Sequence, residues 1–280
     1  MIMRNAGVDQ EYKASAFKSN GETLVKCQNC GLVFIDPFPL SAEKILNEYE
    51  SAIDMEYVSQ IKWRIDTFKK SIKEIERITG FSAGTILDVG AAAGAFVKAA
   101  KDRGWYAQGI EPCKFLVEWG IDNLGLKEVL DCGTVDMVDN GEFNVVTLWD
   151  VIEHTTDPNG TIGEVAKRVE NGGYAVINIP DISSIVPRLM GKSWPFYESA
   201  HLYYFTPTSL DRLMQNHGFE RVYKNRYYQE LSLGYLSYRI SQFSPFVSKI
   251  MVSLVSKLGL SNIPIKYWIG QSILIYKLKK

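Results

Sequence analysis

The sequence predicts an α/β protein with a doubly wound, mainly parallel sheet, and three observations support this. Apolar runs alternate with helical patterns, a glycine turn follows the first run, and an acidic residue stands at the end of each of the first two runs. Such alternation forms parallel sheets whose ligands lie beyond the carboxyl ends of the strands. The expected core elements are strand 85–89, helix 94–103, strand 106–110, helix 113–123, strand 126–130, strand 145–149, helix 159–169 and strand 173–179.

The first strand leads into the turn Asp88-x-Gly90-x-x-x-Gly94. Glycine lets the chain reverse sharply and lets a ligand approach the backbone, and the following helix offers free N–H groups at its start. The dinucleotide fingerprint has a second glycine where this chain has Ala92, and Asp88 suits an ammonium group better than a pyrophosphate. The turn therefore favours S-adenosylmethionine (SAM), which has ammonium and sulfonium groups and no phosphate, over NAD.

The second strand ends at Glu111, which stands 23 residues after Asp88. A carboxylate about 20 residues beyond such a turn holds ribose hydroxyls in nucleotide-binding sheets. Glu111 is therefore expected to bind the ribose, and the alternative is a surface glutamate before a turn. Trp149, at the end of strand 145–149, is expected either to lie against the ligand or to pack in the core.

Two later blocks, 143–158 and 169–180, carry a family resemblance. The first contains Phe143-Asn-Val-Val-Thr-Leu-Trp-Asp-Val-Ile-Glu-His154 and the second a Gly-Gly turn, and together they resemble class I SAM-dependent methyltransferases. The segment 201–219 is similar to the subgroup with ubiquinone-pathway and sugar- or lipid-modifying members. Asn144 replaces the family's usual aspartate, and Ala92 replaces a common glycine. The resemblance covers roughly residues 81–230 and the last strand.

The resemblance implies a seven-stranded Rossmann-like sheet and a transferase that releases S-adenosylhomocysteine. It also implies that adenine lies after the third strand, beside Gly133 and Thr134. Together with the turn, it predicts a set of cofactor-binding residues. These are Asp88, Gly90, Ala92, Gly94, Phe96, Glu111, Gly133, Thr134, Trp149 and Asp150.

Asp150, Glu153 and His154 are spaced so that they would share one face of a helical turn. Two carboxylates and an imidazole can bind a divalent metal, and Glu153 with His154 can act as an acid–base pair. Similar ubiquinone-pathway O-methyltransferases are thought to use this triplet for a metal, with glutamate at the position of Asp150. We favour the alternative in which Glu153 and His154 brace the loop without a metal.

The aromatic segment 185–200 is expected to form a substrate lid over the edge of the active site. His201, which follows it, is a candidate general base for a hydroxyl acceptor, because imidazole takes up protons near neutral pH. The alternative is that His201 anchors the lid by hydrogen bonds.

The net charge and the hydropathy of the chain restrict the kinds of partner that the protein is expected to bind. The chain has a net charge of −1 and no apolar run long enough to span a membrane, and its start lacks the apolar core of a signal peptide. We therefore expect no nucleic-acid partner and a cytoplasmic location, with a small molecule as the methyl acceptor. The oligomeric state is not predicted.

The regions outside the core are expected to be additions. Residues 1–40 contain Cys27-x-x-Cys30, half of a zinc ribbon, and we interpret this region as a degenerate ribbon without metal. Residues 41–80 form a helical segment, and 81–280 form the methyltransferase domain with a helical insertion at about 229–268. The stripe Val247, Ile250, Met251, Leu254 and Leu258 in 245–258 either packs on the core or a second subunit, or contacts a membrane surface.

The function that the sequence predicts is methyl transfer from SAM to a small molecule by direct displacement. The acceptor is expected to be a hydroxyl oxygen of a quinone-, lipid- or sugar-type substrate. A C- or N-methyltransferase acting on a sugar or metabolite and a non-catalytic SAM-binding module remain alternatives.

Overall fold

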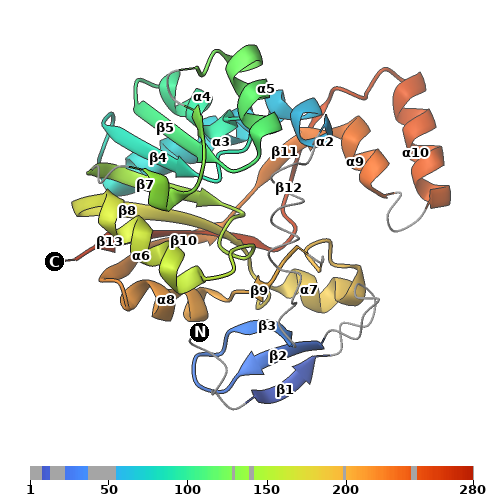
Figure 1. The fold of residues 1–280 in the computed structure, drawn as a ribbon. Helices are drawn as coiled ribbons and strands as arrows, with labels where there is room; N and C mark the ends of the chain where they lie inside the picture. Colours follow the sequence, from blue (N-terminus) through green and yellow to red (C-terminus); the bar gives the residue numbers. More distant parts are fainter. Residues whose placement is uncertain are drawn as a thin grey trace.

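The computed structural model describes residues 8–12, 23–36, 55–127, 130–138, 142–197, 200–240 and 245–279. Its centre is a seven-stranded sheet in the order β10-β13-β8-β7-β4-β5-β6 (Figure 1). Strands β8, β7, β4, β5 and β6 are parallel, and β13 is antiparallel to both of its neighbours. The strand bounds are β4 Thr85–Val89, β5 Tyr106–Glu111, β6 Leu130–Cys132, β7 Phe143–Trp149, β8 Val169–Pro180, β10 Phe219–Arg226 and β13 Gln271–Leu278.

Helices cover both faces of this sheet. Successive side chains of a strand point to opposite sides, so a strand of consecutive apolar residues needs a covering layer on each face. Ile86 belongs to the apolar cluster that contains Ile72 of α3, whereas the next residue, Leu87, belongs to the cluster that contains Ile162 of α6. Figure 1 shows α3, α4 and α5 on one side of the sheet and α6 and α8 on the other. Their bounds are α3 Ile61–Thr79, α4 Ala95–Lys101, α5 Lys114–Leu124, α6 Pro158–Arg168 and α8 Pro207–Gln215.

The predicted fold class is confirmed, but the third strand was predicted too early. The prediction was 126–130, and β6 runs from Leu130 to Cys132. Leu126 lies in the turn after α5, where its side chain is fully buried beneath the backbone of Gly94. Its apolar character therefore serves the packing of the glycine turn and not a strand.

The predicted helical segment 41–80 is partly outside the described residues, which begin again at 55. Within them, a short helix α2 (Met55–Ser59) is followed by α3, and Gln60 lies between the two. Helix α3 ends at Gly80, which adopts the left-handed conformation (φ +80°) that favours glycine.

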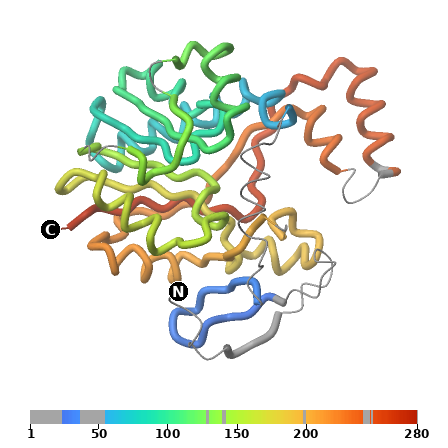
Figure 2. The backbone as a smooth tube through the Cα atoms, viewed as in Figure 1, coloured from blue at the N-terminus to red at the C-terminus, as the bar shows by residue number. Residues whose placement is uncertain are grey.

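The N-terminal strands form a separate antiparallel sheet, β1 (Val8–Tyr12), β2 (Thr23–Cys27), β3 (Val33–Asp36) and β9 (Tyr203–Tyr204). Figure 2 shows the N-terminal part of this sheet beside the yellow chain that holds α7 (Ile185–Met190) and the 3-10 helix η2 (Gly191–Ser193). Trp194 is fully buried in a cluster with Leu24 and Ile35 of the ribbon. The aromatic segment after β8 is therefore packed against this small sheet.

The insertion before the last strand is a helical hairpin on a two-stranded ribbon. Strand β11 (Gln229–Ser232) leads into α9 (Leu233–Arg239) and α10 (Pro245–Lys257), and β12 (Pro264–Tyr267) returns antiparallel to β11. Among the described helices, none is both long enough and apolar enough to cross a membrane.

Candidate active site

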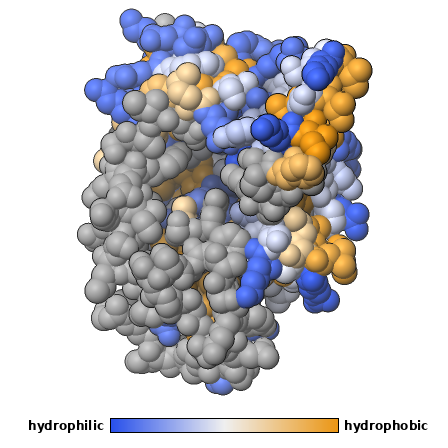
Figure 3. Space-filling model, turned by 90° about the vertical axis from the view of Figure 1, so that its right-hand side faces the viewer, coloured by the Kyte–Doolittle hydropathy of each residue, from blue (hydrophilic) through white to orange (hydrophobic). Residues whose placement is uncertain are grey.

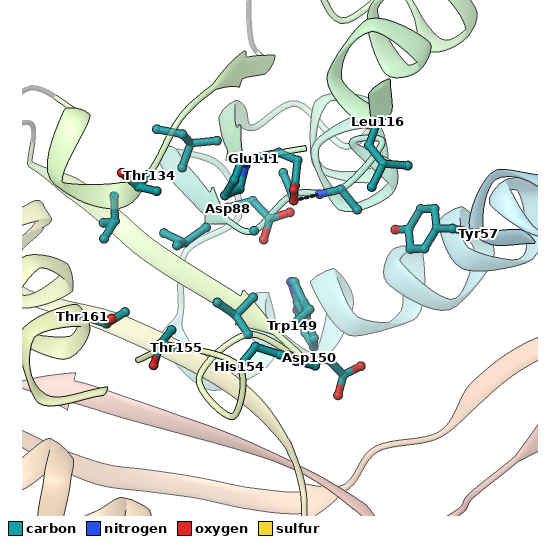
Figure 4. A pocket seen from close by; sticks show the side chains of 18 of the residues that line it. Tyr57, Asp88, Glu111, Leu116, Thr134, Trp149, Asp150, His154, Thr155 and Thr161 are labelled. Atoms are coloured by element: carbon teal, nitrogen blue, oxygen red, sulfur yellow. Dashed lines mark hydrogen bonds between the residues drawn. The ribbon is translucent and has the colours of Figure 1, made fainter. Parts of the chain in front are cut away.

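A cavity of about 740 Å³ opens at the carboxyl ends of the central parallel strands. The turn after β4, the end of β5 and the segments after β6 and β7 form one part of its wall. Helices α2 and α3, strand β11 and the first turns of α6 also contribute to the wall. Figure 4 shows Asp88 and Glu111 on one side of this space and Trp149, Asp150 and His154 on another. The cavity thus lies at the edge of the sheet where the sequence predicted a ligand.

The carboxylate of Glu111 holds the glycine turn in place. Its Oε2 accepts a hydrogen bond from the N–H of Ala92 and its Oε1 accepts one from the N–H of Cys113, both at 2.8 Å. Ala92 has a left-handed backbone (φ +47°), as has Gly90 (φ +70°). A Cβ at Gly90 would lie 2.5 Å from Val151 Cγ2, so the approach of the β7 turn requires glycine there.

Asp88 is a buried carboxyl group at the cavity wall, with only 2% of its surface exposed. The hydroxyl of Thr147 donates a 2.6 Å hydrogen bond to it. The pKa of Asp88 is raised to about 8, chiefly by burial and to a lesser extent by the negative charge of Glu111, whereas the hydrogen bond from Thr147 lowers it. A cation beside this group would favour its ionised form.

The other predicted cofactor residues divide into two sets. Gly133, Thr134, Trp149 and Asp150 line the cavity. Gly94 and Phe96 do not: Gly94 is the left-handed N-cap of α4, and Phe96 lies behind Trp149 with ring centroids 5.3 Å apart. Both residues shape the wall from behind.

Asp150, Glu153 and His154 do not share a helical face, because the turn that holds them is not helical. Asp150 has φ +54°, and the residues that follow it form a turn and not a helix. Its Oδ1 accepts hydrogen bonds from Asn178 at 2.8 Å and Gln271 at 2.7 Å. Asp150 is therefore directed toward the strands β8 and β13.

His201 takes the place of Asp150 beside Glu153 and His154. One side-chain ligand atom of each of these three residues lies within 4.8 Å of the others, and the two imidazole rings are 4.5 Å apart, edge to face. Only His154 of the three lines the cavity, because Glu153 and His201 are buried behind it. The N–H groups of Leu202 and Tyr203 donate to the carbonyl of Glu153, which fixes this loop to β9.

The predicted lid does not cover the cavity in the described part of the chain. No residue of 185–197 lines the cavity, and only Ala200 of the predicted segment does. The apolar and aromatic side chains of this segment instead complete the core of the N-terminal sheet.

The sequence did not predict the part of the cavity wall that is contributed by segments outside the predicted strands and helices of the core. Tyr57, Arg64, Tyr227 and Gln229 line the cavity, and none of them is among the predicted site residues. Arg64 interrupts the apolar face of α3, and this was the available signal. No signal in the sequence pointed to Tyr227 or Gln229, because their position depends on how the insertion before the last strand folds back.

The family model described as "Methyltransferase domain" matches residues 63–224 of this chain. The chain belongs to this family. The match includes the glycine turn, Glu111 and the β7 turn, and the protein is a SAM-dependent methyltransferase. No curated protein matches the sequence.

Solved structures share the fold of this methyltransferase. One is a SAM-dependent methyltransferase from Thermotoga maritima, described as a possible histamine N-methyltransferase, with 19% identity, TM-score 0.52 and coverage of 85% of this chain and 97% of that chain. Another is magnesium protoporphyrin IX methyltransferase from Synechocystis with bound S-adenosylhomocysteine, with 11% identity, TM-score 0.52 and coverage of 87% and 97%. The YcgJ protein of Bacillus subtilis has 14% identity, TM-score 0.52 and coverage of 76% and 98%. At these identities the likeness shows the fold.

A close contact between α5 and the glycine turn of the methyltransferase yields a prediction. A Cβ at Gly120 would lie 2.6 Å from the backbone oxygen of Ala93 and 2.8 Å from Leu130. We expect Gly120→Ala to lower the free energy of unfolding by about 1–3 kcal/mol, as overpacking does, although alanine is the better helix former. Because Ala93 belongs to the glycine turn, S-adenosylhomocysteine affinity should fall as well. Denaturant unfolding and calorimetry measure the two effects.

Gly163 in α6 is the matched control. A Cβ there would approach only the ring of His217, with Cε1 at 3.3 Å and Nδ1 at 3.6 Å. Gly163→Ala should leave ligand affinity unchanged and alter stability by no more than about 1 kcal/mol. Equal effects of the two substitutions would contradict the assignment of a tight contact to Gly120.

Proposed function

We propose that this methyltransferase transfers the methyl group of SAM to a hydroxyl oxygen of a small molecule of the quinone, lipid or sugar type. The observation that carries the proposal is that a single cavity has two chemically different ends. One end presents Asp88 and Glu111 beside the glycine turn, and the other presents Asp150, His154 and Tyr227. Donor and acceptor can therefore lie next to each other in one cavity.

The donor end fits SAM by charge and by hydrogen bonding. Asp88 would pair with the ammonium group, and Glu111 would accept from ribose hydroxyls, since each carboxylate oxygen has a second lone pair. Gly133 and Thr134 would border the adenine. Among the described residues, the buried Nε1 of Trp149 and Nε of Arg64 have no hydrogen-bond partner. Both belong to residues that line the cavity, so these donors are available to polar atoms of a ligand.

The acceptor end is bordered by aromatic rings and polar groups. The ring centroids of Trp149 and Tyr227 are 5.4 Å apart. Burial and the charge of Asp150 raise the pKa of Tyr227 well above its usual value, so its phenol stays neutral and can donate a hydrogen bond. The neutral amide of Gln229 lies on the same wall. These groups suit an acceptor that combines a planar or apolar body with a hydroxyl group.

Methyl transfer from a sulfonium needs the two reactants held in line and the hydroxyl proton removed. We assign the proton removal to His154 and not to the predicted His201, because His154 lines the cavity. Nδ1 of His154 lies 3.0 Å from the carbonyl oxygen of Ala200. A carbonyl only accepts, so Nδ1 carries the proton in the neutral ring and Nε2 keeps the lone pair. His201 would then position His154 through the ring contact, and a metal is not needed for this chemistry.

The experiment that tests the proposal uses SAM labelled on its methyl group, the purified protein and small-molecule extract of the source cells. Label transferred to a product whose methyl group is attached to oxygen supports the proposal. A labelled amine or carbon-methylated product would assign the enzyme to a different acceptor class. Binding of SAM without any labelled product would instead support a non-catalytic SAM-binding module.

A further inference from the structure

The α9–α10 hairpin, residues 233–263, exposes apolar side chains that a water-soluble helix pair normally buries. Of the fourteen large apolar side chains exposed among the described residues, seven lie between 238 and 263. Figure 3, which views the molecule from the side of α9 and α10, shows orange apolar surface there next to blue polar side chains. Contiguous apolar surface of this kind marks an interaction site.

Helix α10 buries Val255 but exposes most of its other described apolar side chains. Ser248 is buried, and its hydroxyl donates a 2.8 Å hydrogen bond to the carbonyl of Ser237 in α9. Four apolar side chains at four-residue spacing face outward, with exposed fractions of 75% for Phe246, 45% for Ile250, 54% for Leu254 and 66% for Leu258. Of the predicted stripe, Ile250, Leu254 and Leu258 therefore face away from the protein core, Met251 is half-buried, and the side chain of Val247 lies outside the described part of the structure.

The charge of this region has one sign. From Leu233 to Ile263 the sequence has Arg239, Lys249 and Lys257 and no aspartate or glutamate, although the whole chain has a net charge of −1. Lys249 and Lys257 stand next to Ile250 and Leu258 in the sequence, and both side chains are exposed. An apolar stripe flanked by lysines matches the interface of an anionic bilayer, where acyl chains meet negative headgroups.

The hairpin is connected directly to the cavity. Strand β11 lines the cavity and continues into α9, whose N-cap Ser232 donates a 3.0 Å hydrogen bond from its hydroxyl to Gln60. Glu56 of α2 accepts hydrogen bonds from Tyr235 at 2.7 Å and Arg239 at 3.0 Å. The next residue of α2, Tyr57, lines the cavity. The same elements therefore carry the exposed stripe and border the acceptor end.

We propose that the α9–α10 hairpin docks on an anionic lipid bilayer and places the acceptor end of the cavity at the membrane surface, so that a lipid-type acceptor enters from the bilayer. This inference rests on the proposed function, whose hydroxyl acceptor it narrows to the lipid class. The apolar stripe enters the interface and the lysines contact lipid phosphates.

The test is sedimentation of the full-length protein with vesicles of phosphatidylcholine, with and without phosphatidylglycerol. We expect binding to the vesicles that contain phosphatidylglycerol, and weaker binding at high salt, because headgroup attraction is screened. The double substitution Ile250→Glu with Leu254→Glu should reduce this binding at least about ten-fold, since it places charge in the apolar stripe. Lys249→Gln and Lys257→Gln should each reduce it about five-fold.

Leu189→Glu is the matched control, because Leu189 is an equally apolar side chain, 78% exposed, on α7. It should leave vesicle binding unchanged, and all variants should keep the affinity for S-adenosylhomocysteine. Equal binding to pure phosphatidylcholine vesicles would overturn the proposal. So would a dimer that the double substitution converts to a monomer, because a second copy would then cover the stripe. If the wild-type protein transfers methyl groups but does not sediment with vesicles, the docking proposal is contradicted. The proposed function is not affected by that result.

Discussion

Replacing Asp88 by alanine is expected to lower the affinity for S-adenosylhomocysteine at least about 100-fold. The carboxyl group is buried at the cavity wall, and a ligand ammonium that loses its buried partner forfeits about 3–5 kcal/mol. Isothermal calorimetry measures this change directly. Asp88→Asn keeps the shape of the side chain and removes only its charge, so it should lose nearly as much affinity as Asp88→Ala.

The raised pKa of Asp88 adds a dependence on pH. With a pKa of about 8 in the ligand-free protein, the carboxyl group is mostly protonated at about pH 7 and must release its proton to pair with a cation. Affinity should therefore rise up to about ten-fold for each pH unit between about pH 6 and pH 7.5, and binding should release close to one proton at neutral pH. Above about pH 8 the ligand's own amino group loses its charge, and the rise should stop.

Calorimetry in buffers with different ionisation enthalpies counts the released protons. Asp88→Asn is the control, because without a titrating carboxyl group the release and the pH dependence should both disappear. A wild-type affinity that stays constant from pH 6 to pH 7.5 would contradict the pairing of Asp88 with the ammonium group.

Substitution of His154 by glutamine is expected to lower kcat about 100- to 10,000-fold, the usual contribution of a general base. The hydroxyl proton of the acceptor would have no nearby group to receive it. S-adenosylhomocysteine affinity should be unchanged, because the donor end of the cavity is built from other strands. Single-turnover kinetics with labelled SAM and the acceptor identified from the extract measure the rate of the chemical step.

The chain has three histidines, and this permits a complete comparison. His217 contacts the side chain of Asn159 and does not line the cavity, so His217→Gln should leave kcat and affinity unchanged. His201→Gln tests the positioning role: it should lower kcat less than His154→Gln and leave donor affinity intact. If His201→Gln abolishes the reaction while His154→Gln does not, the general base is His201, as the sequence alone predicted.

The sequence by itself determined the sheet and the donor end of the cavity. Alternation of strands and helices is a local pattern, and so is the turn that carries Asp88, Gly90 and Ala92. Glu111 follows from one helix and one strand of known length. In parallel sheets such residues lie together because the carboxyl ends of the strands share one edge. Local signals were therefore sufficient to place these residues beside one cavity.

Only the tertiary structure decided the rest of the site. The left-handed backbone of Asp150 turns its side chain away from Glu153 and brings His201 into its place. The aromatic segment after β8 packs on the N-terminal sheet, whereas α3 and β11 border the cavity. Each of these outcomes depends on contacts between residues far apart in the chain, which periodicity and spacing do not encode. For the same reason the sequence showed the apolar stripe of α10, but only the burial of Ser248 against α9 showed that the stripe faces outward.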